Sequence, residues 1–302
     1  MRLTKGLFLG LALAGASLGL LRAQDNVIRI AGSDLLGTAV QELLEQFGAQ
    51  QNIKFVYEMD GTIPALKDLK ANKAEVAIVG RPTQDPVSTP PGFVSRPFCA
   101  EVVYVAVNAA NPLTEISLRQ LSAIYSQRAE SAAERWGIAG MTGEWAMRPL
   151  LAFMPSQSTR LSVEIFKNYV FGKDDRFKPG VRTLDTHELM LTTIGLQNGA
   201  IGFFSTPLLR ANPSLKILPI STAKAGQQSA AFSPTLENVY LGDYPLRLPF
   251  ELVLPEKRDA KMTALLHYLY GDEFSEALQA KGFMPLPASM RKNTTLAIDK
   301  NQ

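Results

Sequence analysis

Cysteine and histidine are scarce in this chain: Cys99 is the only cysteine, and there are two histidines among 302 residues. A single cysteine excludes an intrachain disulfide, and its apolar surroundings (FCAEVVYVAV) favour a small core residue over a reactive thiol. The sequence also lacks an HExxH motif and any cluster of metal-ligating side chains. We therefore expect neither a bound metal nor a cofactor.

A basic excess is lacking as well. The 31 basic residues exceed the 28 acidic ones by three, and three of the basic residues, Arg2, Lys5 and Arg22, belong to an N-terminal segment without acids. The rest of the chain is balanced, which argues against nucleic acid or an anionic membrane surface as a partner. Any anion that the protein binds must be recognised locally.

The N-terminal segment, residues 1–23, has the pattern of a cleavable signal peptide. Its basic start is followed by an apolar run from Leu7 to Leu21 and by a small residue, Ala23, before the polar change at Gln24. The run falls short of the roughly 20 residues of a membrane-spanning helix, and no later stretch is apolar enough to span. We expect cleavage after Ala23 and a periplasmic or secreted protein.

The remaining chain has ordinary globular composition, with 46% hydrophobic and 20% charged residues over the full length. Strand-like and helix-like segments alternate along it, which is typical of an α/β fold with a largely parallel sheet and helices on its faces. The strand-like segments are 27–31, 53–59, 75–80, 101–108, 148–154, 200–205, 215–220 and 244–255. Helix-like segments are 38–48, 63–72, 113–127, 161–171, 187–198 and 261–274.

Three loops share one character, because each follows a strand-like segment and supplies Ser, Thr or Gly ahead of an amphipathic helix. They are GSDLLG (32–37), DGTIP (60–64) and PSQSTR (155–160). Ligands of open α/β sheets bind at the carboxyl ends of strands. The free N–H groups and the dipole of a helix start attract anions there. The alternative is that the serines and threonines are ordinary N-caps.

Ordered fragments along the chain resemble those of one family, the periplasmic phosphate-binding proteins of ABC transporters with the class II solute-binding fold. The fragments are IRIAGSDLLG (28–37), LTEISLRQLSAIYSQ (113–127), WGIAGMTGEWAMRPL (136–150), PSQSTR, NGAIGFF (198–204), YPLRLPF (244–250) and GFMPLP (282–287). The resemblance implies two lobes, each a mostly parallel sheet flanked by helices, joined by crossing strands. Lobe 1 would comprise 24–104 plus 248–302, and lobe 2 would comprise 105–247. It further implies a monomer that closes over a ligand and presents it to a membrane ABC permease.

Carried over position by position, the resemblance implies ligand contacts from the three loops. In the third loop the family's Ser-Gly-Thr corresponds either to Gln157-Ser158-Thr159 or to Ser156-Gln157-Ser158, and the register stays open. The implied ligand-binding residues are Ser33, Asp34, Leu35, Thr62, Arg81, Ser156, Ser158, Thr159 and Arg160.

Charged positions depart from the family pattern. Asp34 stands where the family has Thr, Arg81 stands where it has a proton-accepting aspartate, and the usual strand arginine is missing near Phe153. One hypothesis is that the two charges have exchanged places, with the Arg81 fork binding the anion and Asp34 accepting the proton of hydrogen phosphate. In the other hypothesis Arg81 forms a salt bridge across the lobes, for example to Asp34 itself.

Two further functions compete with anion capture. A secreted phosphatase would use Ser158 or Thr159, but the only imidazoles, His187 and His267, lie in a polar segment and on an apolar helix, and no GxSxG motif is present. A divergent family member with an altered anion site would instead serve in interaction or sensing. We expect a non-enzymatic protein that captures inorganic phosphate or a similar tetrahedral oxyanion for an ABC transporter.

Overall fold

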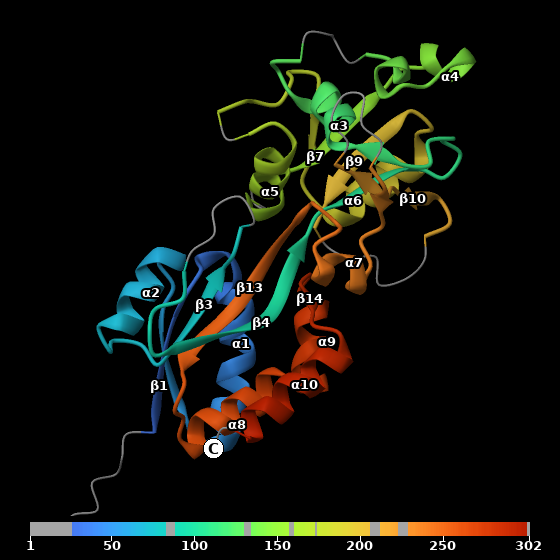
Figure 1. Cartoon of the computed structure of the whole chain (residues 1–302). Helices are drawn as coiled ribbons and strands as arrows, with labels where there is room; N and C mark the ends of the chain where they lie inside the picture. Colours follow the sequence, from blue (N-terminus) through green and yellow to red (C-terminus); the bar gives the residue numbers. More distant parts are fainter. Residues whose placement is uncertain are drawn as a thin grey trace, which may run out of the picture.

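The computed structural model describes residues 26–82, 88–129, 134–156, 160–172, 174–205, 212–222 and 229–300. The elements gather around two separate sheets, and two strands, β4 and β13, lead from one to the other (Figure 1). The expected signal peptide lies outside the described residues. Within the described part of the chain, no helix is long and apolar enough to cross a membrane.

The first sheet has six strands in the order β14-β4-β13-β3-β1-β2. Their bounds are β1 (Val27–Gly32), β2 (Lys54–Glu58), β3 (Val76–Gly80), β4 (Phe93–Val102), β13 (Arg247–Pro255) and β14 (Met284–Pro285). Strand β1 pairs in parallel with β2 and β3, whereas β13 is antiparallel to both β3 and β4. We call the lobe built on this sheet lobe 1.

Lobe 2 contains a five-stranded sheet in the order β10-β5-β9-β7-β8 and a small sheet in the order β12-β11-β6. The bounds are β5 (Tyr104–Asn108), β6 (Ile116–Ser117), β7 (Leu151–Pro155), β8 (Arg182–Leu184), β9 (Ala200–Phe204), β10 (Leu215–Ile217), β11 (Ile220–Ser221) and β12 (Ala231–Phe232). Strand β7 is parallel to β8 and β9, while β5 is antiparallel to β9 and β10.

Helices flank both sheets (Figure 1). Lobe 1 has α1 (Asp34–Gln51), α2 (Thr62–Lys70), α8 (Ala260–Leu269), α9 (Asp272–Ala280) and α10 (Ala288–Asp299). Lobe 2 has α3 (Leu118–Tyr125), the 3-10 helix η1 (Trp136–Ala139), α4 (Gly143–Met147), α5 (Arg160–Val170), α6 (His187–Leu196) and α7 (Leu236–Leu241). Their apolar faces cover two large cores, one in each lobe, in which the largest fully buried side chains are aromatic and branched aliphatic. Cys99 is fully buried in the core of lobe 1, which confirms its expected structural role.

The two-lobed α/β fold expected from the sequence is confirmed, but the sheets are mixed rather than mostly parallel. The β1-β2-β3 and β8-β7-β9 groups are the parallel parts. Antiparallel pairings come from the strands that cross between the lobes, since β4 runs on into β5 and β13 returns beside it. The expected lobe boundaries, 24–104 plus 248–302 and 105–247, stay a prediction.

The segment expected as one last helix, residues 261–274, is in fact divided between α8 and α9. Gly271 is the N-cap of α9, and a Cβ at this position would meet the carbonyl oxygens of Tyr268 at 3.1 Å and His267 at 3.3 Å. The chain therefore turns at a residue whose backbone packs against the preceding helix end. Helix α10 beyond it was not foreseen.

Candidate anion-binding site

The parallel strands β1 and β3 of lobe 1 end at one edge of the sheet, where helices α1 and α2 begin. Helix α1 follows β1 and packs with the core that contains Ile78 and Phe250, whereas α2 follows β2 and packs with the core that contains Ala77 and Val79. Because successive residues of β3 point to opposite faces, the two helices lie on opposite faces of the sheet. The carboxyl ends of β1 and β3 are thus the topological switch point, where open α/β sheets bind their ligands.

Ser33 caps the first of these helices. Its side chain is 3% exposed and accepts from the Leu35 N–H at 3.4 Å, and its own N–H donates to the Ile78 carbonyl at 2.8 Å. Asp34 and Leu35, the first two residues of α1, are exposed beside it. The long α1 therefore has its positive end, with one exposed carboxylate, at this edge of the sheet.

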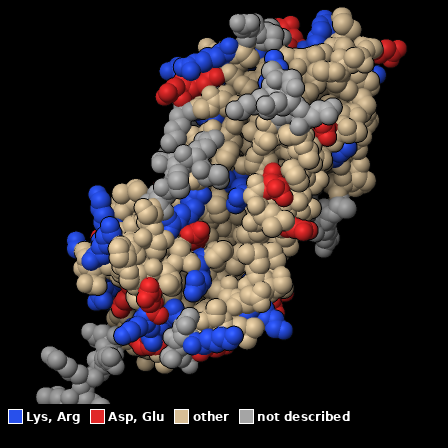
Figure 2. Space-filling view, viewed as in Figure 1, with Lys and Arg blue, Asp and Glu red and all other residues tan. Residues whose placement is uncertain are grey.

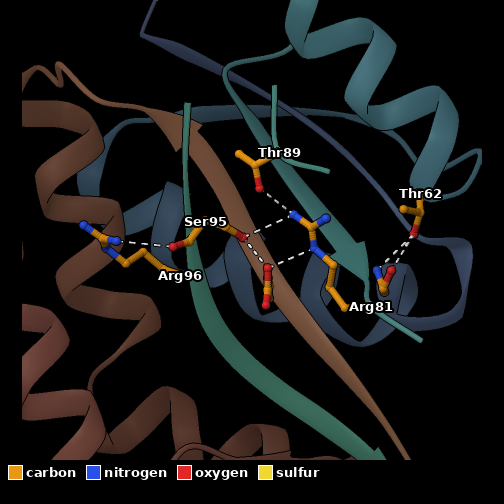
Figure 3. A network of polar contacts seen from close by, with 7 residues as sticks. Thr62, Arg81, Thr89, Ser95 and Arg96 are labelled. Atoms are coloured by element: carbon orange, nitrogen blue, oxygen red, sulfur yellow. Dashed lines mark hydrogen bonds and ion pairs between the residues drawn. The ribbon is translucent and has the colours of Figure 1, made fainter. Parts of the chain in front are cut away.

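Thr62 begins the second helix and ties it to the end of β3. Its Oγ1 accepts from the Gly80 N–H at 2.9 Å (Figure 3), and the preceding residue, Gly61, donates its N–H to the Gly32 carbonyl at 2.9 Å. Gly61 has φ +111°, a backbone conformation that residues with a side chain rarely adopt. The loop before α2 is thus drawn close to the end of β1, which places Ser33 and Thr62 at the same edge of the sheet.

Arg81 follows β3 but has a partner of its own. Its Nε lies 2.9 Å from Glu251 Oε2, and its Nη2 donates to Thr89 Oγ1 at 2.8 Å. Ser95 completes the network by hydrogen-bonding to Glu251. Figure 3 shows the Arg81 side chain directed toward Thr89 and Ser95 and away from Thr62.

The proposed ion pair between Arg81 and Asp34 is therefore wrong, because the acid that pairs with Arg81 is Glu251. Strand β13 places Glu251 beside Val79, which is two residues before Arg81 and on the same face of β3. The pair joins two strands of one lobe and does not bridge the lobes.

The third loop is described only at its two ends. Ser156 follows β7 and donates its N–H to the Leu184 carbonyl at 2.9 Å, and α5 begins at Arg160. Leu161, the next residue, packs against the cores of both lobes. Ser158 and Thr159 lie outside the described residues, as does the side chain of Arg160.

Contacts between the lobes include a buried carboxyl that sequence reasoning missed. Glu101 lies on the crossing strand β4, is 6% exposed and hydrogen-bonds to Ser205, which follows β9 of lobe 2. Burial raises the pKa of Glu101 to about 7, and the Ser205 hydrogen bond opposes the rise. On the other side of the boundary, Tyr240 of α7 donates its hydroxyl to the Met284 carbonyl at 2.8 Å.

A family model described as the PBP superfamily domain matches residues 22–273. The chain belongs to the PBP superfamily.

Individual relatives are distant. Protein SphX of Synechococcus elongatus is 21% identical over 290 residues, which cover 93% of this chain and 83% of the relative. The phosphate-binding protein PstS of Pseudomonas aeruginosa is 26% identical over 203 residues, 64% of this chain and 60% of the relative. These matches confirm the family resemblance noted in the sequence.

Solved structures share the fold of this PBP-superfamily chain at low identity. A structure described as a possible phosphate binding protein from Planctomyces limnophilus has a TM-score of 0.70 at 17% identity, with 91% of this chain and 98% of that chain covered. An ABC-type phosphate transport receptor from Vibrio cholerae has a TM-score of 0.58 at 19% identity, with 86% and 100% covered.

The two histidines of this PBP-superfamily chain contact an acid and an aromatic ring in the described structure. His267 contacts Asp299, with Nε2 2.9 Å from Oδ1, on the exposed surface. His187 packs its ring against Phe204, and burial lowers its pKa. Among the described residues, no three His, Cys, Asp or Glu side chains are grouped to hold a metal.

Proposed function

We propose that the chain is an extracytoplasmic solute-binding protein that captures inorganic phosphate, or a similar tetrahedral oxyanion, between its lobes for an ABC transporter. The observation that carries this proposal is the meeting of the α1 and α2 starts, with Ser33 and Thr62, at the switch point of lobe 1. Two helix N-termini supply N–H donors and positive dipole ends without a lysine. The names of its relatives, a phosphate-binding protein and a phosphate transport receptor, support the choice of anion.

Local recognition fits the mixed charges on one face of the molecule. On the face seen in Figure 2, Lys and Arg are interspersed with Asp and Glu, and no large area carries a single sign. Long-range steering of an anion is therefore weak, and the affinity must come from short contacts in the crevice.

The proposed contacts come from both lobes. Lobe 1 offers the Ser33 and Thr62 hydroxyls and the Leu35 N–H, and lobe 2 offers PSQSTR, with Ser156, Ser158, Thr159 and Arg160 as candidates. The packing of Leu161 against both cores supports a position of this loop at the interlobe boundary. Closure of the lobes would bury the anion and form the surface that an ABC permease recognises.

Charge discrimination is assigned to Asp34 in this proposal. A carboxylate beside the anion accepts a hydrogen bond from hydrogen phosphate, whereas it repels fully ionised sulfate. Arg81 contributes to the ligand only if the anion replaces Glu251 as its partner, because its guanidinium is engaged in the described structure.

Calorimetric titration of the mature chain, residues 24–302, with phosphate, sulfate and molybdate tests the proposal. We expect saturable phosphate binding that is lost when Ser33→Ala and Thr62→Val are combined in a chain that remains folded. Absence of phosphate binding would refute capture and favour the alternative role, an interaction or sensing protein with an altered site. A phosphomonoesterase activity that copurifies with the protein and is lost in Ser158→Ala would refute the assignment as a non-enzyme.

Export and monomeric state belong to the same proposal. Residues 1–23 would direct the chain across the membrane, and cleavage after Ala23 would release it. Mass spectrometry of the exported protein and light scattering of the purified chain test these two points.

A further inference from the structure

Two arginines of lobe 1, Arg96 and Arg258, lie close enough for the charge of Arg96 to act on Arg258. Arg96 is on β4 opposite Leu252 of β13, and Arg258 lies between the end of β13 and the start of α8. Because β13 is antiparallel to β3, its end is at the edge of the sheet opposite to the switch point. In Figure 3 Arg96 extends away from the network of Arg81.

Among the residues that the structure describes, neither arginine forms an ion pair with an acid. The ion pairs of the described residues involve other cations, and the Arg96 side chain donates only to a carbonyl, that of Ser95, from Nη1 at 3.3 Å. The carboxylate next to Arg258 in sequence, Asp259, caps α8 by accepting from the Met262 N–H at 2.8 Å. Glu251 is engaged by Arg81 and Ser95. Asp259 and Glu251 are thus engaged with other groups.

Arg258 also has an unsatisfied donor. Its Nη2 is buried and has no hydrogen-bond partner in the described structure. Burial lowers the pKa of Arg258, and the positive charge of Arg96 lowers it further. A buried N–H of a charged group without an acceptor is costly, and a second like charge beside it adds to the cost. A bound anion would remove both costs.

We propose that Arg96 and Arg258 form a second anion site for a small oxyanion of the phosphate or sulfate type, independent of the interlobe crevice. Two guanidinium groups present planar N–H forks that match the oxygens of such an anion, and they would neutralise its charge jointly. The unsatisfied Nη2 of Arg258 supplies a donor that no protein acceptor uses.

The arginine side-chain N–H signals in an NMR spectrum test this site separately from the crevice. The mature chain is titrated with inorganic phosphate, and in a second series with sulfate, at constant ionic strength set with chloride. We expect the Arg96 and Arg258 Nε–H signals, assigned from Arg96→Gln and Arg258→Gln, to shift with saturation. Signals that stay in place, or drift linearly with concentration, would overturn the proposal.

Variants sharpen the test. In Arg258→Gln the midpoint for the remaining Arg96 shift should rise about tenfold or more, because a charge-assisted contact is lost. Arg182→Gln, an exposed arginine of lobe 2, is the matched control and should leave both midpoints unchanged. An Arg96 shift that saturates with the same midpoint in Arg258→Gln as in the unaltered chain would contradict a joint site. Should a variant fail to fold, its signal is assigned in the unaltered chain by triple-resonance NMR, and the titration of the unaltered chain still decides.

Discussion

Arg81 and Glu251 form an ion pair between neighbouring strands, 170 residues apart in the chain, with Nε 2.9 Å from Oε2. Glu251 therefore competes with any anion for the same guanidinium. We expect Glu251→Gln to bind phosphate more tightly than the unaltered chain if Arg81 contacts the ligand. Arg81→Ala should then weaken phosphate binding by roughly ten- to a hundred-fold, since a charge-assisted contact is removed.

The same two variants have a different outcome if the pair is only structural. Each should then lower the melting temperature, and calorimetry should find the phosphate affinity unchanged. Glu251→Gln should be the more damaging, because it leaves a largely buried guanidinium, 13% exposed, without its carboxylate. Opposite changes in affinity support ligand contact, and parallel losses of stability alone refute it.

Asp34→Asn should alter selectivity more than total affinity. The substitution removes the acceptor for the proton of hydrogen phosphate and also a negative charge at the start of α1. Phosphate binding should weaken while sulfate binding improves, as measured by calorimetry with both anions at one pH. The control is Asp243→Asn, an exposed acid beyond α7. Equal losses for both anions would contradict the role of Asp34.

Thr62→Val should weaken phosphate binding and lower stability together. Valine keeps the shape of the side chain but leaves the Gly80 N–H without its acceptor. The free energy of unfolding should fall by about 1–3 kcal/mol, the cost of an unsatisfied backbone donor. Thr62→Ser, which keeps the hydroxyl, should largely restore both properties in urea unfolding and calorimetry. Normal binding in Thr62→Val would exclude the hydroxyl from the site.

Glu101 should make the stability of the protein fall as pH rises. Its pKa is about 7 in the folded chain against an ordinary value of 4.5, so the folded state retains a proton that the unfolded state releases between these values. The loss begins near the lower value, is complete above the higher one and amounts to about 3 kcal/mol. Urea unfolding across this range should show it.

In Glu101→Gln this pH dependence should be largely absent, because the amide is neutral throughout. Glu115→Gln, an exposed acid of lobe 2, should keep the slope of the unaltered chain. An unchanged slope in Glu101→Gln would show that another group is responsible.

Sequence patterns predicted the local parts of this structure well. The alternation of strand and helix and the helix start near Thr62 depend on neighbouring residues, and the structure confirms both. Helix α1 instead begins at Asp34, four residues before the expected start at Thr38, with Ser33 as its cap. The ion-pair partner of Arg81 could not be predicted from neighbouring residues, because Glu251 lies beside Arg81 only through the pairing of β3 with β13. A lone acid within the apolar segment 244–255 was the available signal. The burial of Glu101 could not be predicted for the same reason, since it arises where the two lobes meet.

The hydrogen bond from Tyr240 to Met284 links the lobes at a point away from the two strands that cross and from the Glu101–Ser205 hydrogen bond. Two adjacent crossing strands alone allow both bending and twisting. We expect this attachment, between helix α7 and the edge strand β14, to resist twisting more than bending. Opening the lobes must either break this bond or pull β14 along, and β14 leads directly into the C-terminal helix α10. The position of α10 is therefore mechanically linked to the gap between the lobes.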